Sequence, residues 1–499
     1  MDIKSPKLAG VCIVWKRDKD DIKVLIIKRG DNLTFLPGHH AFPGGSVEDE
    51  DKKCMVCGFC NEKIKSALVG AIRETFEETG YLPIQISENI CKNELIEIWE
   101  KLHKKEIFFN EIQKRFNIEL IVDKYFFSGP WITPPGLPQR FETYFFFIEW
   151  KQEFHEINIR KDNEVDLIEW DTPKNLLYRW HKKEISLSTP VAFILEQIEG
   201  FSIPGAFNYL KKIPWENNAY SYFHPRAGIH VFPLPAPAQT FFINVNSVVV
   251  GKEEMVIIDP GLGEEESIRK MIYWLEHFIK VGAKIIGVFI THEHLDHAKG
   301  STLIAEYFDI PIYASFETAK KKIIPVDKII KKDEKFVLGD MMFPWIINTI
   351  PTPGHVKGHL CYYEETTQTL IAGDMISSEG PVVIDPDDGG SMSEYMDSLE
   401  NLNRLKIDLL IPGHGVPWFF MPGNIIIEKL IKHRKQREKK IYENIKKGIT
   451  TFDELLKISY DDVPKERLIL ARQQLKAHLI DLKNKGILMA NTYNLILSS

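Results

Sequence analysis

Residues 284–297 read KIIGVFITHEHLDH, an apolar run followed at once by a cluster of imidazoles and carboxylates. The run KIIGVFI is typical of a buried β-strand. Side chains two residues apart on an extended backbone point the same way, so His292 and His294 can reach one metal ion together. Asp296 and His297 follow just past the strand end and can serve a second ion. Imidazole and carboxylate are the ligands that Zn²⁺ takes in hydrolytic sites.

Three further candidate ligands each follow a strand-like run or lie in a glycine-containing loop: His355 in TPGHVKGH, Asp374 in TLIAGDM and His414 in LLIPGHG. A lone histidine on an apolar segment is usually structural, but H-x-H-x-D-H followed by three such loops is a much more specific pattern. Seven nitrogen and oxygen ligands are too many for one tetrahedral ion. The sequence therefore predicts a site for two zinc ions.

The motifs THEHLDH, TPGH, AGD and PGHG, with Asp259 in VIIDPG before them, resemble the successive motifs of the metallo-β-lactamase superfamily. This resemblance implies a hydrolase with an αββα sandwich, which we place at residues 228–423. Asp259 would orient a ligand without touching metal. The implied arrangement puts one zinc ion on His292, His294 and His355 and a second on Asp296, His297 and His414, with Asp374 bridging them as a catalytic residue.

The last part of the chain is basic, because residues 428–499 contain 16 Lys/Arg and 9 Asp/Glu, a net charge of +7. We expect three helices and a hairpin at ILMANTYNLIL (487–497), which together make a winged-helix domain at 424–499. A metallo-β-lactamase domain with such a tail resembles the mitochondrial endoribonuclease-like branch, which implies single-stranded RNA as a partner. The alternative is a solvated helix that packs on the catalytic domain. The expected phosphate contacts are Arg434, Lys435, Arg437, Lys439 and Lys440.

A second constellation lies near the N-terminus, in AIRETFEETGYL. Glu74, Glu77 and Glu78 stand at i, i+3 and i+4, so a helix presents all three carboxylates on one face. A hard divalent cation such as Mg²⁺ relieves their mutual repulsion. Arg73 is placed to orient a carboxylate by bidentate hydrogen bonds. The alternative is an acidic, solvated helix.

Gly44 and Gly45 in FPGGSVEDED, followed by RETFEETG, resemble the Nudix box, with two departures. The first acidic position is Asp51 instead of Glu, and 21 residues instead of 7 separate it from Arg73. IIKRGDNL, WITPPGLPQRFETYFF and VDLIEWDTPKNLL extend the likeness to Nudix hydrolases of the coenzyme A diphosphatase type. It implies an α/β/α Nudix domain at residues 1–200, with Mg²⁺ or Mn²⁺, glutamate catalysis, and a nucleoside diphosphate or coenzyme A derivative as substrate.

Within that insertion, CMVCGFC places Cys54, Cys57 and Cys60 at C-x2-C-x2-C, a spacing that can wrap a metal ion. A fourth ligand is missing nearby, because Ile64 stands where an iron-sulfur run would place cysteine. The alternatives left open are an extra metal and three reduced cysteines in a loop. Residues 201–227 mix proline, glycine and aromatics without a sustained period, and we interpret them as a linker.

A length of 499 residues favours two to four domains, and the net charge of -7 argues against a polyanion binder as a whole. Neither a signal peptide nor an apolar stretch long enough for a membrane helix is recognised, so we expect a cytoplasmic, α/β multidomain protein without membrane contact. A homodimer is left open. The leading hypothesis is a bifunctional hydrolase with a zinc site for RNA phosphodiesters and a Nudix diphosphatase site. The alternatives are an acyl-thioester hydrolase acting with the Nudix domain on coenzyme A derivatives, and a Nudix domain that only binds a ligand or RNA.

Overall fold

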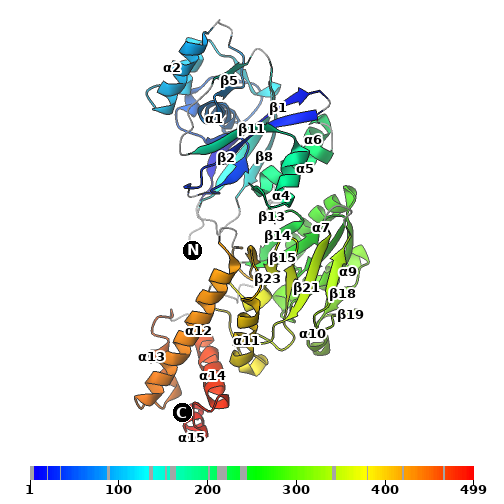
Figure 1. Ribbon diagram of the computed structural model, residues 1–499, viewed down its shortest axis with the longest axis vertical. Helices are drawn as coiled ribbons and strands as arrows, with labels where there is room; N and C mark the ends of the chain where they lie inside the picture. The colour runs from blue at the N-terminus through cyan, green and yellow to red at the C-terminus, as the bar shows by residue number, and fades with distance from the viewer. Residues whose placement is uncertain are drawn as a thin grey trace. The chain divides into compact units, whose positions relative to one another are not determined.

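The structure is a computed structural model of the whole chain, which divides into two compact units, Met1–Ala227 (unit 1) and Gly228–Ser499 (unit 2). Each unit is described by itself (Figure 1). Parts of the predicted linker, residues 201–202 and 211–221, lie outside the described residues. The structure describes residues 5–19, 21–33, 35–86, 90–133, 139–151, 154–157, 164–200, 203–210, 222–236, 244–339, 344–378, 380–417, 421–464 and 467–498.

Unit 1 is built on one mixed sheet whose strands run in the order β12-β3-β2-β1-β9-β8, with β4 paired to β1 and β11 paired to β2. The two longest neighbours, β1 and β9, are parallel, and β1 and β2 form an antiparallel hairpin. The strands are β1 (Lys7–Asp18), β2 (Asp21–Arg29), β3 (His39–Ala41), β4 (Gly44–Ser46), β8 (Phe126–Ile132), β9 (Phe141–Glu149), β11 (Val165–Asp171) and β12 (Ser186–Leu187).

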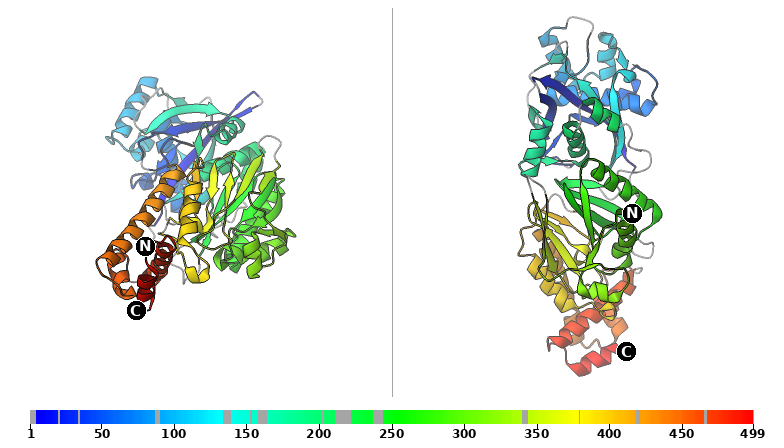
Figure 2. Two further views of the ribbon diagram at one scale, coloured as in Figure 1. Left: turned by 60° about the horizontal axis from the view of Figure 1, so that its bottom comes forward. Right: turned by 90° about the vertical axis from the view of Figure 1, so that its right-hand side faces the viewer.

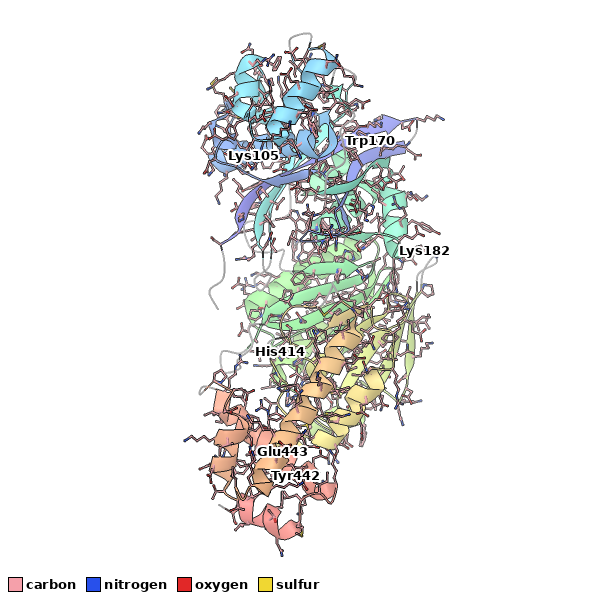
Figure 3. The ribbon with its side chains drawn as sticks, turned by 60° about the vertical axis from the view of Figure 1, so that its left-hand side comes forward. Lys105, Trp170, Lys182, His414, Tyr442 and Glu443 are labelled. Atoms are coloured by element: carbon pink, nitrogen blue, oxygen red, sulfur yellow. The ribbon has the colours of Figure 1, made fainter. Side chains whose placement is uncertain are left out.

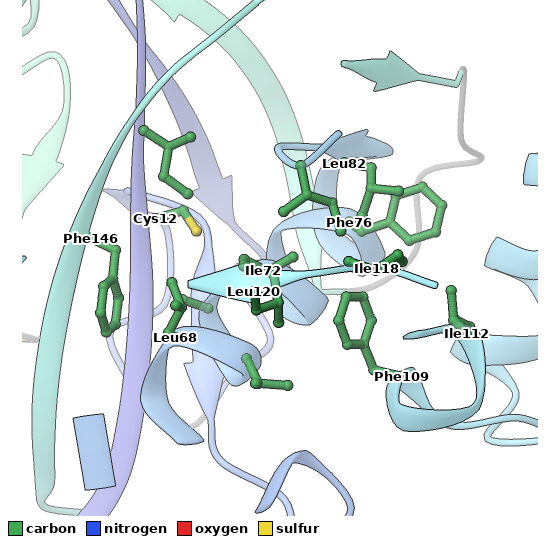
Figure 4. Close-up of a cluster of buried hydrophobic side chains, with 14 of the residues drawn as sticks. Cys12, Leu68, Ile72, Phe76, Leu82, Phe109, Ile112, Ile118, Leu120 and Phe146 are labelled. Carbon is green, nitrogen blue, oxygen red and sulfur yellow. The ribbon is translucent and has the colours of Figure 1, made fainter. Parts of the chain in front are cut away.

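The helix predicted before Gly80 is α1 (Glu62–Thr79), and Gly80 ends it in the left-handed conformation. Its apolar face packs on the sheet, where Leu68, Ile72 and Phe76 join the core (Figure 4). This close packing requires Gly10 in β1, because a Cβ there would lie 1.8 Å from the carbonyl oxygen of Ala67. The other helices are α2 (Lys92–His103), α3 (Phe109–Arg115), α4 (Pro173–His181), α5 (Thr189–Gly200) and α6 (Ile203–Leu210).

Short elements complete unit 1, and several of them come from the insertion in the Nudix-like box. The insertion forms a 3-10 turn, the short strand β5 and the first part of α1. These elements are η1 (Asp51–Lys53), β5 (Val56–Cys57), β6 (Tyr81–Leu82), β7 (Leu120–Ile121), η2 (Val122–Lys124), β10 (His155–Glu156) and β13 (Phe223–Arg226).

Unit 2 contains two sheets, one running β14-β15-β16-β17-β18-β19 and the other β20-β21-β22-β23-β24. The sheets face each other through aromatic side chains: the ring of Phe289 lies 5.7 Å from that of Tyr362, whose hydroxyl donates to the carbonyl of Ile290 at 2.8 Å. The strands are β14 (Ile229–Pro235), β15 (Asn244–Gly251), β16 (Glu254–Ile258), β17 (Lys284–Phe289), β18 (Ile312–Ala314), β19 (Lys328–Ile329), β20 (Lys335–Leu338), β21 (Trp345–Pro351), β22 (Leu360–Glu364), β23 (Thr369–Ile371) and β24 (Leu409–Ile411).

Helices cover the outer faces of both sheets, which gives the αββα sandwich (Figure 1). On the first sheet, α7 buries Met271, Trp274 and Leu275. On the second, α11 and α12 close a core that contains Tyr395 and Ile427. The helices are α7 (Glu265–Lys280), α8 (Leu295–Ala298), α9 (Gly300–Phe308), α10 (Phe316–Lys321), α11 (Met392–Leu402) and α12 (Gly423–Lys446), with the 3-10 turns η4 (Gly373–Met375) and η5 (Pro386–Asp388).

The C-terminal region continues from α12 into α13 (Phe452–Ser459), α14 (Leu468–Asn484) and α15 (Ala490–Leu497), which share a second small core (Figure 2). The predicted hairpin at 487–497 is wrong, because most of this segment is the helix α15. No glycine or proline within 487–497 offers a tight turn, and helical spacing brings Tyr493 and Ile496 to the core together. Among the residues that the structure describes, this region therefore has no β wing.

None of the described helices is long and apolar enough to cross a membrane.

Candidate functional site

The predicted ligands of unit 2 all lie where strands of the two sheets end. His292 and His294 follow β17, Asp374 follows β23, and His414 follows β24. Asp296 and His297 fall in the short helix α8 instead of on an extended strand end. The structure brings all seven predicted ligands together in two groups, each with ligand atoms within 4.8 Å of one another: His292, His294, His355 and Asp374, and then Asp296, His297 and His414.

Asp374 joins the two groups through its two carboxylate oxygens. Its Oδ2 faces the first group, at 3.9 Å from His292 Nε2 and 3.6 Å from His355 Nε2. Its Oδ1 faces the second group, at 3.3 Å from His297 Nε2 and 3.2 Å from His414 Nε2. With its two oxygens facing different groups, Asp374 could contribute a ligand to each of two ions.

Asp259 fixes the two buried histidines that follow β17. It stands after β16, where its Oδ2 accepts from His297 Nδ1 at 2.8 Å and from Thr291 Oγ1 at 2.6 Å. Because the Thr291 hydroxyl proton is used for Asp259, its oxygen accepts from His292 Nδ1 at 2.9 Å. Both rings therefore carry their proton on Nδ1 and present a free lone pair at Nε2.

Backbone carbonyls hold His355 and His414 in the tautomer that carries its proton on Nδ1. A carboxylate holds His294 in the other tautomer, with the proton on Nε2. His355 Nδ1 donates to the carbonyl of Val383 at 2.7 Å, and His414 Nδ1 donates to that of Asn244 at 2.9 Å. His294 is reversed: its Nε2 lies 2.8 Å from Asp388 Oδ2, which leaves Nδ1 free. That nitrogen lies 3.0 Å from both His292 Nε2 and His355 Nε2.

Five imidazole lone pairs thus converge with the carboxylates of Asp374 and Asp296, an arrangement that repels itself unless cations lie between the ligands. Asp374 Oδ1 is buried and accepts no hydrogen bond of good geometry from the described residues. Burial lowers the pKa of His297, but the carboxylates around it, with Asp374 the strongest, outweigh burial and hold that pKa well above its usual range. Positive charge is therefore favoured at this point, and the donor set fits metal ions.

One side of the group is open to solvent. The side chains of His292 and His297 are fully buried, whereas that of His294 is 31% exposed and that of Asp388 is 47% exposed. His414, labelled in Figure 3, is buried at the inner side. A substrate can therefore approach from the side of His294.

Sequence reasoning missed the residues that hold the ligands in place. Asp388, in the acidic run DPDDGG, could have been found as a further carboxylate after the AGD motif. The carbonyls of Val383 and Asn244 have no side-chain signature. His359 was also missed: it is buried, its Nδ1 lies 2.8 Å from Thr352 Oγ1, and its ring lies 5.1 Å from that of His292.

In unit 1, Arg73 orients a carboxylate as predicted from the sequence, and that carboxylate is Asp51. Arg73 Nε and Nη2 donate to the two oxygens of Asp51 at 2.9 and 3.0 Å, and both side chains are buried. The 21 intervening residues loop out and return, so the first acidic position of the box meets its arginine despite the insertion. Arg73 Nη2 also donates to the carbonyl of Ser46 at 2.9 Å, which ties the glycine loop to α1.

Glu74, Glu77 and Glu78 lie around Arg73 and the glycine loop. Arg73 Nη1 donates to Glu77 at 2.7 Å and lies 3.1 Å from Glu74, while Gly44 N donates to Glu78 at 2.9 Å. Among the described residues, their oxygens are not gathered within 4.8 Å of one another. Burial raises the pKa of Glu77 to about 8, against the opposing effect of Arg73. The charged carboxylates are thus costly here without a cation.

Two further features of unit 1 bear on this group. Gly45 packs against Glu74, because a Cβ at Gly45 would lie 2.5 Å from the Glu74 carboxyl carbon. Burial raises the pKa values of Glu74 and Glu78, and the nearby carboxylate of Glu164 raises them further. Glu164 was not singled out in the sequence, since it lies far along the chain, just before β11.

Cys54, Cys57 and Cys60 form none of the metal-compatible clusters found among the described residues. All three are free thiols, with Cys57 exposed. Burial raises the pKa of Cys54 to about 12, which disfavours the thiolate that a metal would need. The geometry favours the alternative of three reduced cysteines in a loop.

The basic residues of α12 mostly serve folding contacts. Arg434 and Arg437 are buried, so the expectation that they contact RNA phosphates is wrong. Arg434 bonds to Gln474 and Val382, and Arg437 forms a bidentate pair with Asp462. The remaining three predicted contacts are exposed but paired with carboxylates: Lys435 with Glu400, Lys439 with Glu443 and Lys440 with Asp461.

Comparison with known proteins finds two family domains in the chain. The family model described as the metallo-beta-lactamase superfamily matches residues 240–414, and the NUDIX domain model matches residues 6–188. An uncharacterized protein of Aquifex aeolicus is 31% identical over 202 residues, covering 34% of this chain and 85% of that protein. A hydroxyacylglutathione hydrolase of Buchnera aphidicola is 33% identical over 217 residues, covering 41% and 75%.

An atrochrysone carboxyl ACP thioesterase of Aspergillus chevalieri is 25% identical over 235 residues, covering 44% of this chain and 69% of that protein. Among solved structures, a beta-lactamase domain protein from Burkholderia ambifaria aligns with a TM-score of 0.45 at 18% identity, covering 53% of this chain and 88% of that one. A NUDIX hydrolase from Alicyclobacillus acidocaldarius aligns with a TM-score of 0.34 at 23% identity, covering 42% and 98%.

The fold and the clustered histidines of unit 2 define a metal-dependent hydrolase. The chain belongs to the metallo-beta-lactamase superfamily through residues 240–414 and carries a NUDIX domain at residues 6–188, so it is a hydrolase with two family domains.

Proposed function

We propose that unit 2 is a two-zinc hydrolase of acyl thioesters and that unit 1 is a Mg²⁺- or Mn²⁺-dependent diphosphatase for a coenzyme A derivative or another nucleoside diphosphate. The observation that carries the first part is the convergence of five ring nitrogens with Asp374, whose two oxygens face different groups of histidines. Nitrogen and carboxylate ligands of this kind favour zinc.

The residues of the site have two roles: some would bind the ions and others orient the ligands. His292, His294 and His355 would hold one ion, Asp296, His297 and His414 the other, and Asp374 both. Two zinc ions held there would supply an activated water molecule and would polarise the carbonyl of the substrate. Asp259 and Asp388 keep the rings in the tautomers that bind metal, and the open side at His294 admits the acyl group.

A thioester is favoured over the RNA phosphodiester that the tail suggested. One relative is named as a thioesterase and another as a hydroxyacylglutathione hydrolase. The alignment with this chain covers more than two thirds of each relative. The burial of Arg434 and Arg437 removes the strongest cations of the expected RNA surface. A thioester of coenzyme A would also give the two units a common metabolite.

The test uses the full-length protein with Zn²⁺ and Mg²⁺ supplied separately. The substrates are an acyl-coenzyme A, a hydroxyacyl glutathione, coenzyme A and labelled single-stranded RNA. We expect zinc-dependent release of thiol from one of the thioesters and magnesium-dependent cleavage of the coenzyme A diphosphate. Zinc-dependent cleavage of RNA with both thioesters intact would overturn the proposal for unit 2.

A further inference from the structure

A short segment of unit 2, Val382–Asp388, separates the metal-binding group from the C-terminal helices; we call it the strap. On one side the strap touches two ligands. The carbonyl of Val383 accepts from His355 Nδ1 at 2.7 Å, and Asp388 Oδ2 lies 2.8 Å from His294 Nε2. The strap thus decides which nitrogen each of these rings presents to a metal ion.

The other side of the strap is held by α12 and α14. The carbonyl of Val382 accepts from Arg434 Nη2 at 2.6 Å and from Gln474 Nε2 at 2.5 Å. Both side chains are buried, and Arg434 Nη1 donates to Gln474 Oε1 at 2.8 Å. Burying a guanidinium group is costly unless its N–H groups are hydrogen-bonded. An apolar side chain at this position would not carry that cost.

Two more contacts hold the far end of the strap. Gln473 Nε2 donates to Asp385 Oδ2 at 2.6 Å, and Lys476 Nζ bonds both oxygens of Asp387 at 2.6 and 2.7 Å. Neighbouring residues therefore face opposite ways. Val382 and Asp387 bind the helices, whereas the next residue in each case, Val383 and Asp388, binds a histidine.

The second half of the metal-binding group has no such connection among the described residues. His297 is oriented by Asp259, and His414 by the carbonyl of Asn244 in β15. Among the described residues, no side chain of the C-terminal helices donates a hydrogen bond to either of these two acceptors. The rings of the two halves are therefore oriented by different acceptors, although both halves share Asp374.

We propose that α12 and α14 are a positioning element for the metal centre: through the strap they orient His355 and His294, and so tune the affinity of that half alone. This gives the C-terminal region a role in place of the RNA contacts expected from its charge. The inference rests on the proposed two-metal site, but it does not depend on the substrate.

The test compares the double variant Gln473→Ala/Lys476→Ala with Arg472→Ala in the full-length protein. Arg472 lies on the same helix and forms an ion pair with Asp453 at 2.6 Å, but it does not touch the strap. Each protein is loaded with Zn²⁺, and its release to a chromogenic chelator is followed, with Tm measured in parallel. Asp388→Asn changes a strap residue that contacts His294 itself. Lys476→Arg is the conservative variant, since an arginine keeps the ion pair with Asp387.

In the double variant we expect one of the two ions to leave about tenfold faster and the other to leave at the wild-type rate, since loss of an outer partner costs about 10–100-fold in metal affinity. Asp388→Asn should accelerate the same ion at least as much, whereas Arg472→Ala and Lys476→Arg should match the wild type. Release equal to that of Arg472→Ala, or equal acceleration of both ions with a lowered Tm, would overturn the positioning role. A wild-type protein that binds no zinc would instead refute the metal centre itself, and this role with it.

Discussion

The two candidate sites differ in how completely the protein chain assembles them. In unit 2, five imidazoles converge because each is held by an oxygen acceptor such as Asp259 or the carbonyl of Val383. In unit 1, Glu74, Glu77 and Glu78 share one helical face, but Arg73 and the backbone of Gly44 take up their oxygens. In unit 2 the acceptors around the group fix the ring orientations, whereas in unit 1 the carboxylates are engaged by Arg73 and Gly44; both groups are costly without a cation.

The largest effect is expected from Asp374→Ala, because this is the one side chain shared by both halves of unit 2. Thioester hydrolysis should fall more than about 100-fold, beyond what loss of an outer partner costs. The diphosphatase activity of unit 1, measured on the same sample, should be unchanged. Retention of full thioester hydrolysis would show that the histidine group is not the catalytic centre.

Glu77→Gln should remove most of the diphosphatase activity, by about 100-fold, since it weakens the cation site or removes a base. The matched control is Glu62→Gln, on the first turn of the same helix, where the exposed Glu62 side chain pairs with Lys65. Cleavage of coenzyme A by both variants is compared with Mg²⁺ present. Equal activity in Glu77→Gln and in the control would favour a NUDIX domain that only binds its ligand.

RNA binding by α12 should be weak and nearly independent of salt. Each phosphate contact on a single strand adds about -0.7 to the salt slope, and only exposed lysines such as Lys435 and Lys439 remain to make one. Affinity of the full-length protein for labelled single-stranded RNA is measured at about 50 and 200 mM salt. A steep loss that disappears in Lys435→Ala/Lys439→Ala would restore the nucleic-acid role.

The smallest effect concerns stability. The hydrogen bonds from Arg437 lower the pKa of Asp462 to about 2, below the value of about 3.9 expected in the unfolded chain. The pair therefore stabilises the protein above pH 4, and this contribution is lost as the pH falls towards 2. Asp462→Asn should cost less than about 1 kcal/mol at pH 6, because the carboxylate is largely exposed. The difference in Tm from wild type should shrink by pH 3; a constant difference would contradict the assigned cause.

The sequence predicts the ligands better than it predicts what holds them. His292, His355 and His414 follow strand ends in dense motifs, so spacing alone places them at one edge of the sandwich. The carbonyls of Val383 and Asn244 are invisible to such reasoning, since every residue has one. A count of charges also says nothing about pairing, which is why the burial of Arg434 and Arg437 came only from the structure.

The same limit explains the C-terminal hairpin. ILMANTYNLIL is apolar enough for two short strands, but whether it forms them depends on a partner surface, and the core formed by α13 and α14 takes up Ile496 from a helix. In unit 1, by contrast, the sequence predicts that Arg73 orients a carboxylate, and the structure identifies that carboxylate as Asp51 in spite of the inserted residues. An insertion in a loop can leave a local motif intact. A short apolar segment, by contrast, does not determine whether it forms a strand or a helix.

The most direct test of the two-metal site is the metal content of the full-length protein purified from zinc-replete medium, with Asp374→Ala in parallel. Elemental analysis should find about two zinc ions per chain in the wild type, because the seven ligands form two groups joined by one carboxylate. Fewer should remain in the variant. A wild-type protein that contains no transition metal would contradict the account.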